Sequence, residues 1–398
     1  QHKTIKLIKR IPRTHQKKAI AASKKYYLDN KNVNGKLIMP CATGKSLTAF
    51  WIAKSLDCKR IIVAVPSLSL IKQSLGDWTK EYLAHGITPE WLCICSDDSV
   101  GKVDLDEFDS DAYDLGIPTT TDKKEIVAFL KRRTKQPKII FTTYQSSRRL
   151  AEAAREAKAL FDFAVMDEAH KTAGNKDKAF STLLFNKNIK IKKRLFMTAT
   201  ERVFRGKNDS VVSMSDHKVY GEDIYVMSFK DAIDQGIISD YKILTMTISN
   251  DEFNNLIEGN RYVTHNDSDN DSNAQYLASG IAIKKAFKKF KIKHAISFHR
   301  SIKKAKSFKD QQDNLNKIKS LGPVTNNYHI SSKKSSGQRV ELIKEFTESK
   351  RSLLTNARCL TEGVDIPSID GVMFVDPKQS TIDIVQACGR ALRKYDGK

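Results

Sequence analysis

The sequence predicts an α/β protein with two tandem domains, each built on a mainly parallel sheet with helices on both faces. Short apolar runs of the kind that form buried strands alternate with helical stretches along the chain. A chain of 398 residues is also too long for one ordinary core. Several runs end in small hydroxyl residues, at the sheet edge where ligands of α/β proteins bind. The runs lie at 36–39, 60–65, 138–146, 161–166, 194–200, 294–299, 352–355 and 371–376.

Composition divides the chain into a first domain at 1–240, a linker at 241–275 and a second domain at 276–398. An acidic, strand-poor segment at 97–122 interrupts the first domain and is expected to be a surface insertion. The linker is polar, with Asp, Asn and Ser at its centre. Because the chain begins at Gln1 without a methionine and stops soon after its last arginine motif, we expect a fragment of a larger protein with a truncated second domain.

Net charge is the strongest compositional signal. Lys plus Arg number 69 against 46 Asp plus Glu, which gives a net charge of +23. This excess favours a polyanionic partner, either nucleic acid or an anionic membrane surface. No apolar run reaches the roughly 18 residues that span a bilayer, and no signal peptide begins the chain. The six cysteines are scattered without zinc-ligand spacing. We therefore expect a soluble cytoplasmic protein with reduced thiols and no membrane partner.

The first chemical motif is the loop at 40–46, which lies between an apolar run and a helical stretch. A strand, a tight turn and a helix N-terminus direct backbone N–H groups and the positive end of a helix dipole at one spot, which suits a polyphosphate. Lys45 would contact the β- and γ-phosphates, and the Ser46 hydroxyl would bind Mg²⁺. The full pattern has more glycine than this loop, in which only Gly44 remains. The alternative is an ordinary strand–turn–helix junction that carries a lysine.

Two adjacent carboxylates, Asp167 and Glu168, follow the apolar run at 161–166. Like charges this close resist joint ionisation, and a bound cation removes that cost. Asp167 is therefore expected to hold Mg²⁺, while Glu168 orients and deprotonates the water that attacks the γ-phosphate. The alternative is a solvated Asp-Glu cap on a following helix.

Two arginines near the end of the chain, Arg390 and Arg393, stand three positions apart on a predicted helix. At this spacing both guanidinium groups project from one face of the helix. A phosphoryl-transfer site needs cationic groups at the γ-phosphate oxygens, and an arginine from another domain can supply one. The alternative is a pair of surface arginines that only meet solvent.

In this order the motifs resemble those of a superfamily 2 helicase or translocase of the DEAH type. The resemblance covers nearly the whole chain, and its segments are Arg13-x-x-Gln16, PCATGKS, VPSLSL, TTYQS, DEAH, TAT, SFHRS, 361–367 and QACGRALR. Two further stretches, 114–122 and 376–386, are similar to the motor region of single-polypeptide restriction–modification enzymes. This narrower resemblance implies a motor fused to nuclease or methyltransferase regions, or to both.

The resemblance implies two RecA-like domains with ATP and Mg²⁺ in the cleft between them. Arg13 and Gln16 would contact adenine. Residues of the second domain would approach the nucleotide from the opposite side, and a glutamine would join the two arginines around the γ-phosphate. The residues implied in binding or catalysis are Arg13, Gln16, Cys41, Ala42, Thr43, Gly44, Lys45, Ser46, Asp167, Glu168, Gly363, Asp365, Gln386, Arg390 and Arg393.

Other positions match the parts of the family that couple hydrolysis to movement and bind the strand. Thr198 and Thr200 would couple hydrolysis to domain movement. Ala42 stands where the family usually has a glycine, and this departure affects the fine geometry of the loop. The positions that match the nucleic-acid track are Pro66, Ser67, Thr143, Ser297, His299 and Thr361.

The predicted function is therefore that of an ATP-dependent translocase or helicase on duplex DNA, the motor portion of a larger restriction-type or defence enzyme. Two alternatives stay open: a nucleic-acid-stimulated ATPase that clamps or senses without translocation, and an RNA helicase. A P-loop ATPase that acts on proteins or small molecules is a third, but the net charge of +23 and the second arginine-bearing domain disfavour it.

Overall fold

A computed structural model of the chain describes residues 8–95, 117–175, 179–204, 210–249, 251, 254, 270–331, 334, 336–357, 366, 369–378, 380–392 and 394. The chain divides into two compact units, with the boundary between Ile237 and Ile238. The three-part division expected from the sequence stays a prediction. No helix among these residues is long and apolar enough to cross a membrane.

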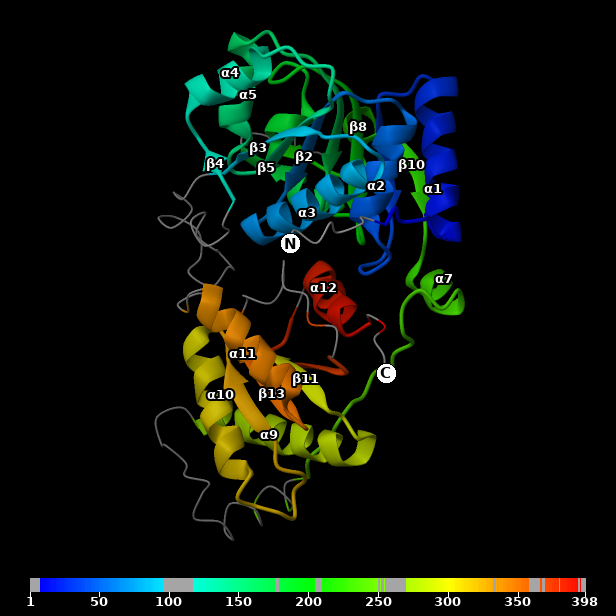
Figure 1. Ribbon diagram of the computed structural model, residues 1–398. Helices are drawn as coiled ribbons and strands as arrows, with labels where there is room; N and C mark the ends of the chain where they lie inside the picture. The colour runs from blue at the N-terminus through cyan, green and yellow to red at the C-terminus, as the bar shows by residue number, and fades with distance from the viewer. Residues whose placement is uncertain are drawn as a thin grey trace, which may run out of the picture. The chain divides into compact units, whose positions relative to one another are not determined.

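The described part of unit 1 contains one eight-stranded sheet in which every strand pair is parallel (Figure 1). The strand order is β10-β1-β8-β6-β2-β5-β3-β4. The carboxyl ends of β1, β8 and β6 therefore lie next to one another at one edge. The strands are β1 (Asn34–Ile38), β2 (Arg60–Val65), β3 (Glu90–Ile94), β4 (Thr119–Thr120), β5 (Lys138–Thr143), β6 (Phe161–Met166), β8 (Ile191–Thr198) and β10 (Glu222–Val226).

Helices cover both faces of this sheet, because its strands carry apolar side chains in both directions. On one face, Trp78 packs edge-on against Phe141 of β5. On the other face, Ile126 and Leu150 join a cluster with Ile62 of β2. The first face carries α1 (Thr14–Lys24), η1 (Lys25–Asp29), α2 (Lys45–Ser55) and α3 (Leu68–Ala84); the second carries α4 (Lys123–Lys131), α5 (Ser147–Glu156), η4 (Ala169–Thr172), η5 (Ala179–Leu184) and α6 (His217–Tyr220). Outside the main sheet lie α7 (Phe229–Asp234) and the antiparallel pair of β7 (Gly174–Asn175) with β9 (Val211–Val212).

Unit 2 repeats the architecture on a smaller scale. Its described strands form a four-stranded parallel sheet in the order β12-β13-β11-β14. Phe287 and Phe308 pack on one face of the sheet with Leu353, and Phe346 and Ala387 pack on the other. Its elements are α9 (Asn270–Phe290), β11 (His294–Phe298), α10 (Ile302–Leu315), β12 (Asn326–His329), α11 (Ser336–Glu348), β13 (Ser352–Asn356), β14 (Gly371–Phe374) and α12 (Thr381–Ala391).

The same hydrogen-bonding arrangement occurs in both units. In unit 1 the Asp162 carboxylate accepts the backbone N–H groups of Lys59 and Arg60, at 3.1 and 3.0 Å, where β2 begins. In unit 2 the Asp370 carboxylate accepts the N–H groups of Lys293 and His294, both at 2.9 Å, where β11 begins. A carboxylate at the start of one strand thus holds the start of its neighbour in each sheet. The predicted fold class, two tandem α/β domains with mainly parallel sheets, is confirmed.

Several sequence expectations concern residues that the structure describes only in part. Residues 97–116 of the expected acidic insertion lie outside the described residues. Of the expected linker, 241–249 has no regular secondary structure, and α9 already begins at Asn270. None of Cys41, Cys58, Cys93, Cys95 and Cys388 forms a disulfide, and Cys359 is not among the described residues.

Candidate functional site

The loop between β1 and α2 has the backbone shape that a phosphate site requires. Gly44 has a φ of +83° and forms the N-terminal boundary of α2, where Lys45 is the first helical residue. Ala42 has a φ of +64°, which is a left-handed conformation that an alanine adopts at a cost. The sequence departs from the family glycine at this position, but the backbone keeps the conformation for which glycine is suited.

The two side chains expected to meet a nucleotide are both held in the loop. Lys45 is buried, and its ammonium donates to the carbonyl oxygens of Met39 at 3.3 Å and Pro40 at 3.4 Å. The Ser46 hydroxyl oxygen is buried and makes no hydrogen bond. A buried hydroxyl without a partner costs free energy, and a cation or phosphate oxygen would remove that cost.

Two neighbouring side chains of α1 hold the loop from one side. Nε2 of His15 lies 2.9 Å from the carbonyl oxygen of Thr43, and Nε2 of Gln16 donates to the carbonyl oxygen of Gly44 at 3.3 Å. The amide oxygen of Gln16 accepts the Arg13 N–H at 2.8 Å. The Gln16 amide keeps one unused N–H and one unused lone pair, the pair of groups that an adenine edge could engage. His15 was not singled out in the sequence, although it directly precedes Gln16.

The paired carboxylates lie where β6 ends. Asp167 and Glu168 are half-buried, and Glu168 has a φ of +49°. Burial, and then the Glu168 charge, raise the pKa of Asp167, while the nearby Lys45 ammonium acts in the opposite direction. The Glu168 N–H donates to the Asp167 carboxylate at 2.9 Å, and Oε2 of Glu168 is buried without a hydrogen bond. Two crowded carboxylates next to a lysine are suited to a divalent cation.

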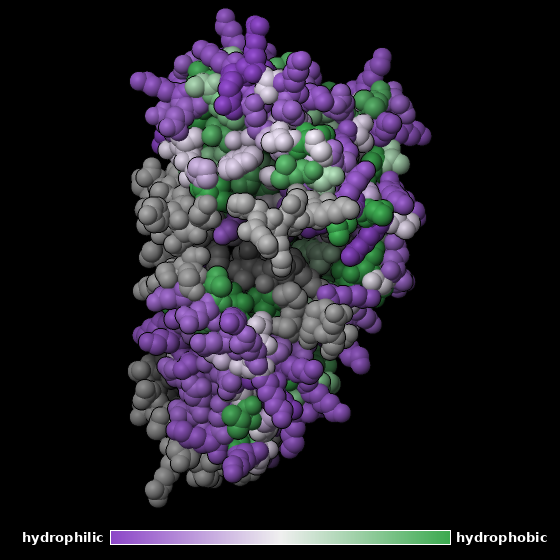
Figure 2. Space-filling view, in the orientation of Figure 1, coloured by the Kyte–Doolittle hydropathy of each residue, from purple (hydrophilic) through white to green (hydrophobic). Residues whose placement is uncertain are grey.

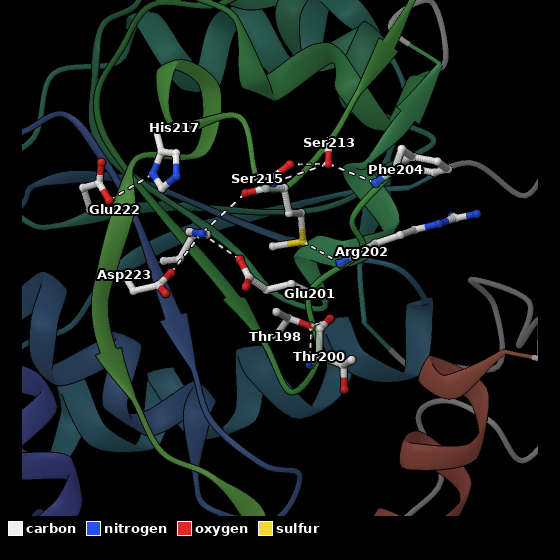
Figure 3. A network of polar contacts seen from close by, with 12 residues as sticks. Thr198, Thr200, Glu201, Arg202, Phe204, Ser213, Ser215, His217, Glu222 and Asp223 are labelled. Carbon is white, nitrogen blue, oxygen red and sulfur yellow. Dashed lines mark hydrogen bonds and ion pairs between the residues drawn. The ribbon is translucent and has the colours of Figure 1, made fainter. Parts of the chain in front are cut away.

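A histidine connects the carboxylates to the turn after β8. Nδ1 of His170 lies 3.0 Å from Oγ1 of Thr198 and 3.6 Å from Oε2 of Glu168. The Thr198 hydroxyl donates to the Thr200 carbonyl at 2.9 Å and accepts the Thr200 N–H at 3.2 Å. Because the single hydroxyl hydrogen is already used, Nδ1 of His170 must carry the proton of the third contact. Figure 3 shows Thr198 and Thr200 together in this turn.

The residues expected on the nucleic-acid track are less exposed than a binding surface would be. Pro66 is buried and Ser67 half-buried. The Thr143 hydroxyl accepts the Ser146 N–H at 3.4 Å, next to the start of α5. In unit 2, Ser297 and His299 are fully buried, and their side chains are bonded to each other at 2.9 Å. The structure does not present these two side chains to solvent, and the nucleic-acid role of the whole group stays a prediction.

Part of the expected site lies outside the described residues: Thr361, Gly363, Asp365 and Arg393. Arg390 belongs to α12, but its side chain is not described either. Gln386 lies on α12 and is buried. The convergence of these residues on the loop at 40–46 therefore stays a prediction.

The described residues of unit 1 nevertheless fit a magnesium-bound triphosphate. The fit consists of the unpartnered Ser46 hydroxyl and the buried Lys45 ammonium after β1, and the Asp167–Glu168 pair after β6, with β8 between these two strands. Within the part of the chain that the structure describes, no cluster of three or more His, Cys, Asp or Glu side chains could hold a metal alone. A metal here would therefore need oxygen ligands from the phosphates and water, as Mg²⁺ in nucleotide sites usually has.

Comparison with known proteins identifies two families along the chain. Residues 9–202 match the family of the type III restriction enzyme, res subunit, and residues 280–395 match the helicase conserved C-terminal domain. A probable helicase of African swine fever virus is 26% identical over 365 residues, which is 90% of this chain and 37% of the relative. The chain thus spans little more than a third of that relative's length.

Two solved structures of restriction–modification enzymes are similar over nearly the whole chain. The ATP-dependent Type ISP enzyme LlaBIII bound to DNA has a TM-score of 0.79 at 27% identity, over 98% of this chain and 27% of that one. A nuclease-deletion mutant of the Type ISP enzyme LlaGI, in complex with a DNA substrate mimic, has a TM-score of 0.68 at 26% identity, over 96% of this chain and 26% of that one. By its two matched domains and its tandem RecA-like units, the chain is a superfamily 2 helicase motor that resembles Type ISP restriction–modification enzymes.

Proposed function

We propose that this motor hydrolyses ATP with Mg²⁺ and uses the cycle to move along duplex DNA. The observation that carries the proposal is the arrangement at the carboxyl edge of unit 1, where Lys45 acts electrostatically on Asp167 and Ser46 has a buried hydroxyl without a partner. Duplex DNA is favoured because both similar Type ISP structures contain DNA or a DNA mimic. The net charge of +23 also favours a polyanion.

Each residue of unit 1 has a defined part in the proposed reaction. Lys45 would exchange its two carbonyl partners for the β- and γ-phosphates, and Ser46 and Asp167 would hold Mg²⁺. When bound, the metal neutralises charge on the phosphate oxygens. Glu168 would orient the attacking water and take its proton, since its Oε2 makes no hydrogen bond. His170 would pass a change at Glu168 to the turn at Thr198.

Unit 2 would complete the site and supply the second grip on DNA. Gly363 and Asp365 would approach the nucleotide, and Gln386, Arg390 and Arg393 would surround the γ-phosphate. A site shared by two units binds ATP differently in closed and open arrangements, so hydrolysis can shift the equilibrium between them. Hydrophilic side chains dominate the visible surface around α4 and α10 (Figure 2), and phosphate contacts there would give sequence-independent, salt-sensitive binding.

The larger protein is part of the proposal as well. We propose that nuclease or methyltransferase regions, or both, accompany this motor in a restriction-type or defence enzyme. The support is the similarity to Type ISP restriction–modification enzymes, of whose chains this one covers about a quarter. A cytoplasmic location is proposed with it.

ATP turnover with three polyanions tests the activity. Phosphate release by the wild type is measured with duplex DNA, single-stranded DNA and RNA, alongside Glu168→Gln. We expect duplex DNA to stimulate most and Glu168→Gln to lose about two to four orders of magnitude in turnover while it still binds nucleotide. Glu125, exposed on α4, gives the control variant Glu125→Gln, which should match the wild type. Stronger stimulation by RNA than by either DNA would replace the proposal with an RNA helicase.

Displacement of a third strand from a DNA triplex separates movement from clamping. A translocase removes the third strand in an ATP-dependent reaction whose delay grows with the distance it has to travel. A clamp or sensor shows DNA-stimulated ATP turnover without any displacement, and that result would overturn the translocase proposal. Turnover that no nucleic acid stimulates would overturn both.

A further inference from the structure

A lysine that the predicted mechanism does not use is buried in the middle of β1. The Lys36 side chain is only 4% exposed, on a strand that leads directly into the phosphate loop. Burying an ammonium is costly, and an apolar side chain of similar length would fill the same volume without that cost. A buried charge at this position therefore calls for a reason beyond packing.

Two carboxylates from different elements compensate this charge. The Lys36 ammonium lies 2.6 Å from Glu201 and 2.9 Å from Asp223, and 3.4 Å from the carbonyl oxygen of Met214. In Figure 3 the carboxylates of Glu201 and Asp223 point toward one shared nitrogen. Burial alone would lower the pKa of Lys36, but the hydrogen bonds and charges of Glu201 and Asp223 outweigh it and the pKa is raised. The lysine is therefore charged at neutral pH.

The two carboxylates have different positions relative to the proposed chemistry. Asp223 lies on β10 and is the direct strand partner of Lys36, beside an irregularity in the pairing of these two strands. Glu201 immediately follows Thr200, in the turn that contacts His170 through Thr198. Of the two carboxylate contacts of Lys36, only the one with Glu201 reaches that turn.

A second tie joins the same two segments. The Met39 N–H donates to the Thr198 carbonyl at 3.0 Å, and the Met39 carbonyl accepts from Lys45. Beyond the β1–β8 pairing, the stretch from β1 to the phosphate loop is thus connected to the turn after β8 at Thr198 and at Glu201, on either side of Thr200. A displacement of the phosphate loop would be transmitted to the turn as long as both ties hold.

We propose that Lys36 is a positioning residue that fixes the turn at 198–201 through Glu201, so that the turn follows changes at the phosphate loop. This inference rests on the proposed ATP-dependent motor function and deepens it. Lys36 touches neither nucleotide nor DNA in this role, and it acts through the position of Thr198 and Thr200. Its loss should therefore change how strongly DNA stimulates turnover, and leave nucleotide affinity nearly as it is.

The test compares variants of the 398-residue chain by ATP turnover with and without saturating duplex DNA, and by the KM for ATP. We expect Lys36→Met and Glu201→Gln to lower the stimulation by DNA about tenfold, within the range of ordinary coupling energies, with the KM for ATP changed by less than about twofold. Lys36→Arg, which keeps the charge, should retain most of the stimulation by DNA that the wild type shows. Asp223→Asn removes the other carboxylate and should behave like the wild type.

Each outcome supports or overturns the proposal. If Asp223→Asn loses as much stimulation as Glu201→Gln, Lys36 only balances buried charge and the positioning role is wrong. If Lys36→Met keeps full stimulation while its thermal midpoint falls, the lysine is merely structural. A wild type without DNA-stimulated turnover would instead contradict the motor function itself, so the two failures are distinguishable. Glu201→Gln keeps the test decisive even if Lys36→Met does not fold, since the Glu201 side chain is 30% exposed.

Discussion

The imidazole of His15 donates from Nε2 to the carbonyl oxygen of Thr43, 2.9 Å away, and so connects α1 to the phosphate loop. The carbonyl oxygen can only accept, so the ring nitrogen must carry the proton. Burial lowers the pKa of His15 against the opposing hydrogen bond to Thr43, and the ring is neutral near pH 7. The adjacent Gln16 holds the next carbonyl, that of Gly44. Two successive loop carbonyls are therefore held by side chains of α1.

Replacing His15 should weaken nucleotide binding. His15→Phe keeps the ring but removes the donor, and we expect the KM for ATP to rise about fivefold, equivalent to one net hydrogen bond of about 1 kcal/mol. His85 offers a matched control, because Nδ1 of its ring lies 2.8 Å from the Glu81 carbonyl oxygen, away from the phosphate loop. His85→Phe should leave the KM for ATP unchanged. An equal rise in both variants would show that the His15 contact has no special effect on the loop.

Glycine should make the protein more stable than alanine does at position 42. The φ of +64° at Ala42 is unfavourable for any residue with a Cβ. We expect Ala42→Gly to raise the free energy of unfolding by about 0.5–1 kcal/mol in urea titrations, after allowance for the extra freedom of glycine in the unfolded chain. Ala49, fully buried inside α2, provides the control. Ala49→Gly should cost about 1 kcal/mol, and a loss of the same size from Ala42→Gly would contradict the strain argument.

The sequence predicted most of what apolar periodicity and short motifs can determine. The runs at 60–65 and 161–166 became β2 and β6 with the same bounds, because β-branched and aromatic residues buried on both faces leave little choice. Strands β10 and β12 were missed. Asn326–His329 is polar, and Glu222–Val226 begins with two acidic residues, so neither forms a continuous apolar run, and pairing with β1 and β13 makes them strands.

The sequence could predict which residues the site contains, but it could not predict which side chains contact one another. Lys45, Asp167 and Glu168 follow from motifs, which give chemistry at fixed spacing. The Lys36–Glu201 pair joins residues that are 165 positions apart, and no local pattern marks it. A lysine inside an apolar run before the loop was the one available signal, and only the fold shows that two carboxylates reach it.

Asp167→Asn should stabilise the nucleotide-free protein at neutral pH. The pKa of Asp167 is raised by burial and by Glu168, so the folded state binds more protons than the unfolded state between the unfolded and folded pKa values. Stability therefore falls as pH rises through that window. We expect Asp167→Asn to gain about 1–2 kcal/mol at pH 7–8, with allowance for partial solvent exposure, and to lose this gain progressively as pH falls from about 6 to about 4. Unfolding in urea across this pH range measures it.

Asp162, near the start of β6, should show the opposite dependence of stability on pH. Although its burial would raise its pKa, hydrogen bonds from Lys192 and from two backbone N–H groups lower it. Its contribution to stability is then present above the unfolded pKa and disappears as pH falls through the lower folded pKa. Asp162→Asn should therefore destabilise the protein at neutral pH. If both variants shifted stability in the same direction, the electrostatic account of Asp167 would be wrong.

Gln312 on α10 should be replaceable by an apolar side chain with a gain in stability. Its side-chain amide is buried, and neither its nitrogen nor its oxygen makes a hydrogen bond. The amide packs so closely on α9 that a Cβ at Gly280 would lie 2.6 Å from its nitrogen. An unpartnered buried amide costs about 1–3 kcal/mol, and methionine has similar length and no such requirement. We expect Gln312→Met to raise the free energy of unfolding by about 1–2 kcal/mol.

Calorimetric and urea-induced unfolding of Gln312→Met would check this gain. Gln136→Met is the control, because the Gln136 side chain is exposed and the change should alter stability by less than about 0.5 kcal/mol. Gly280→Ala should lower the free energy of unfolding of the wild type, because the added methyl group meets the Gln312 amide. The loss should be smaller in the Gln312→Met background, since methionine is more flexible. A Gln312→Met protein that is less stable than the wild type would mean that the amide has a partner in solution, such as an ordered water, whose hydrogen bonds outweigh the cost of burial.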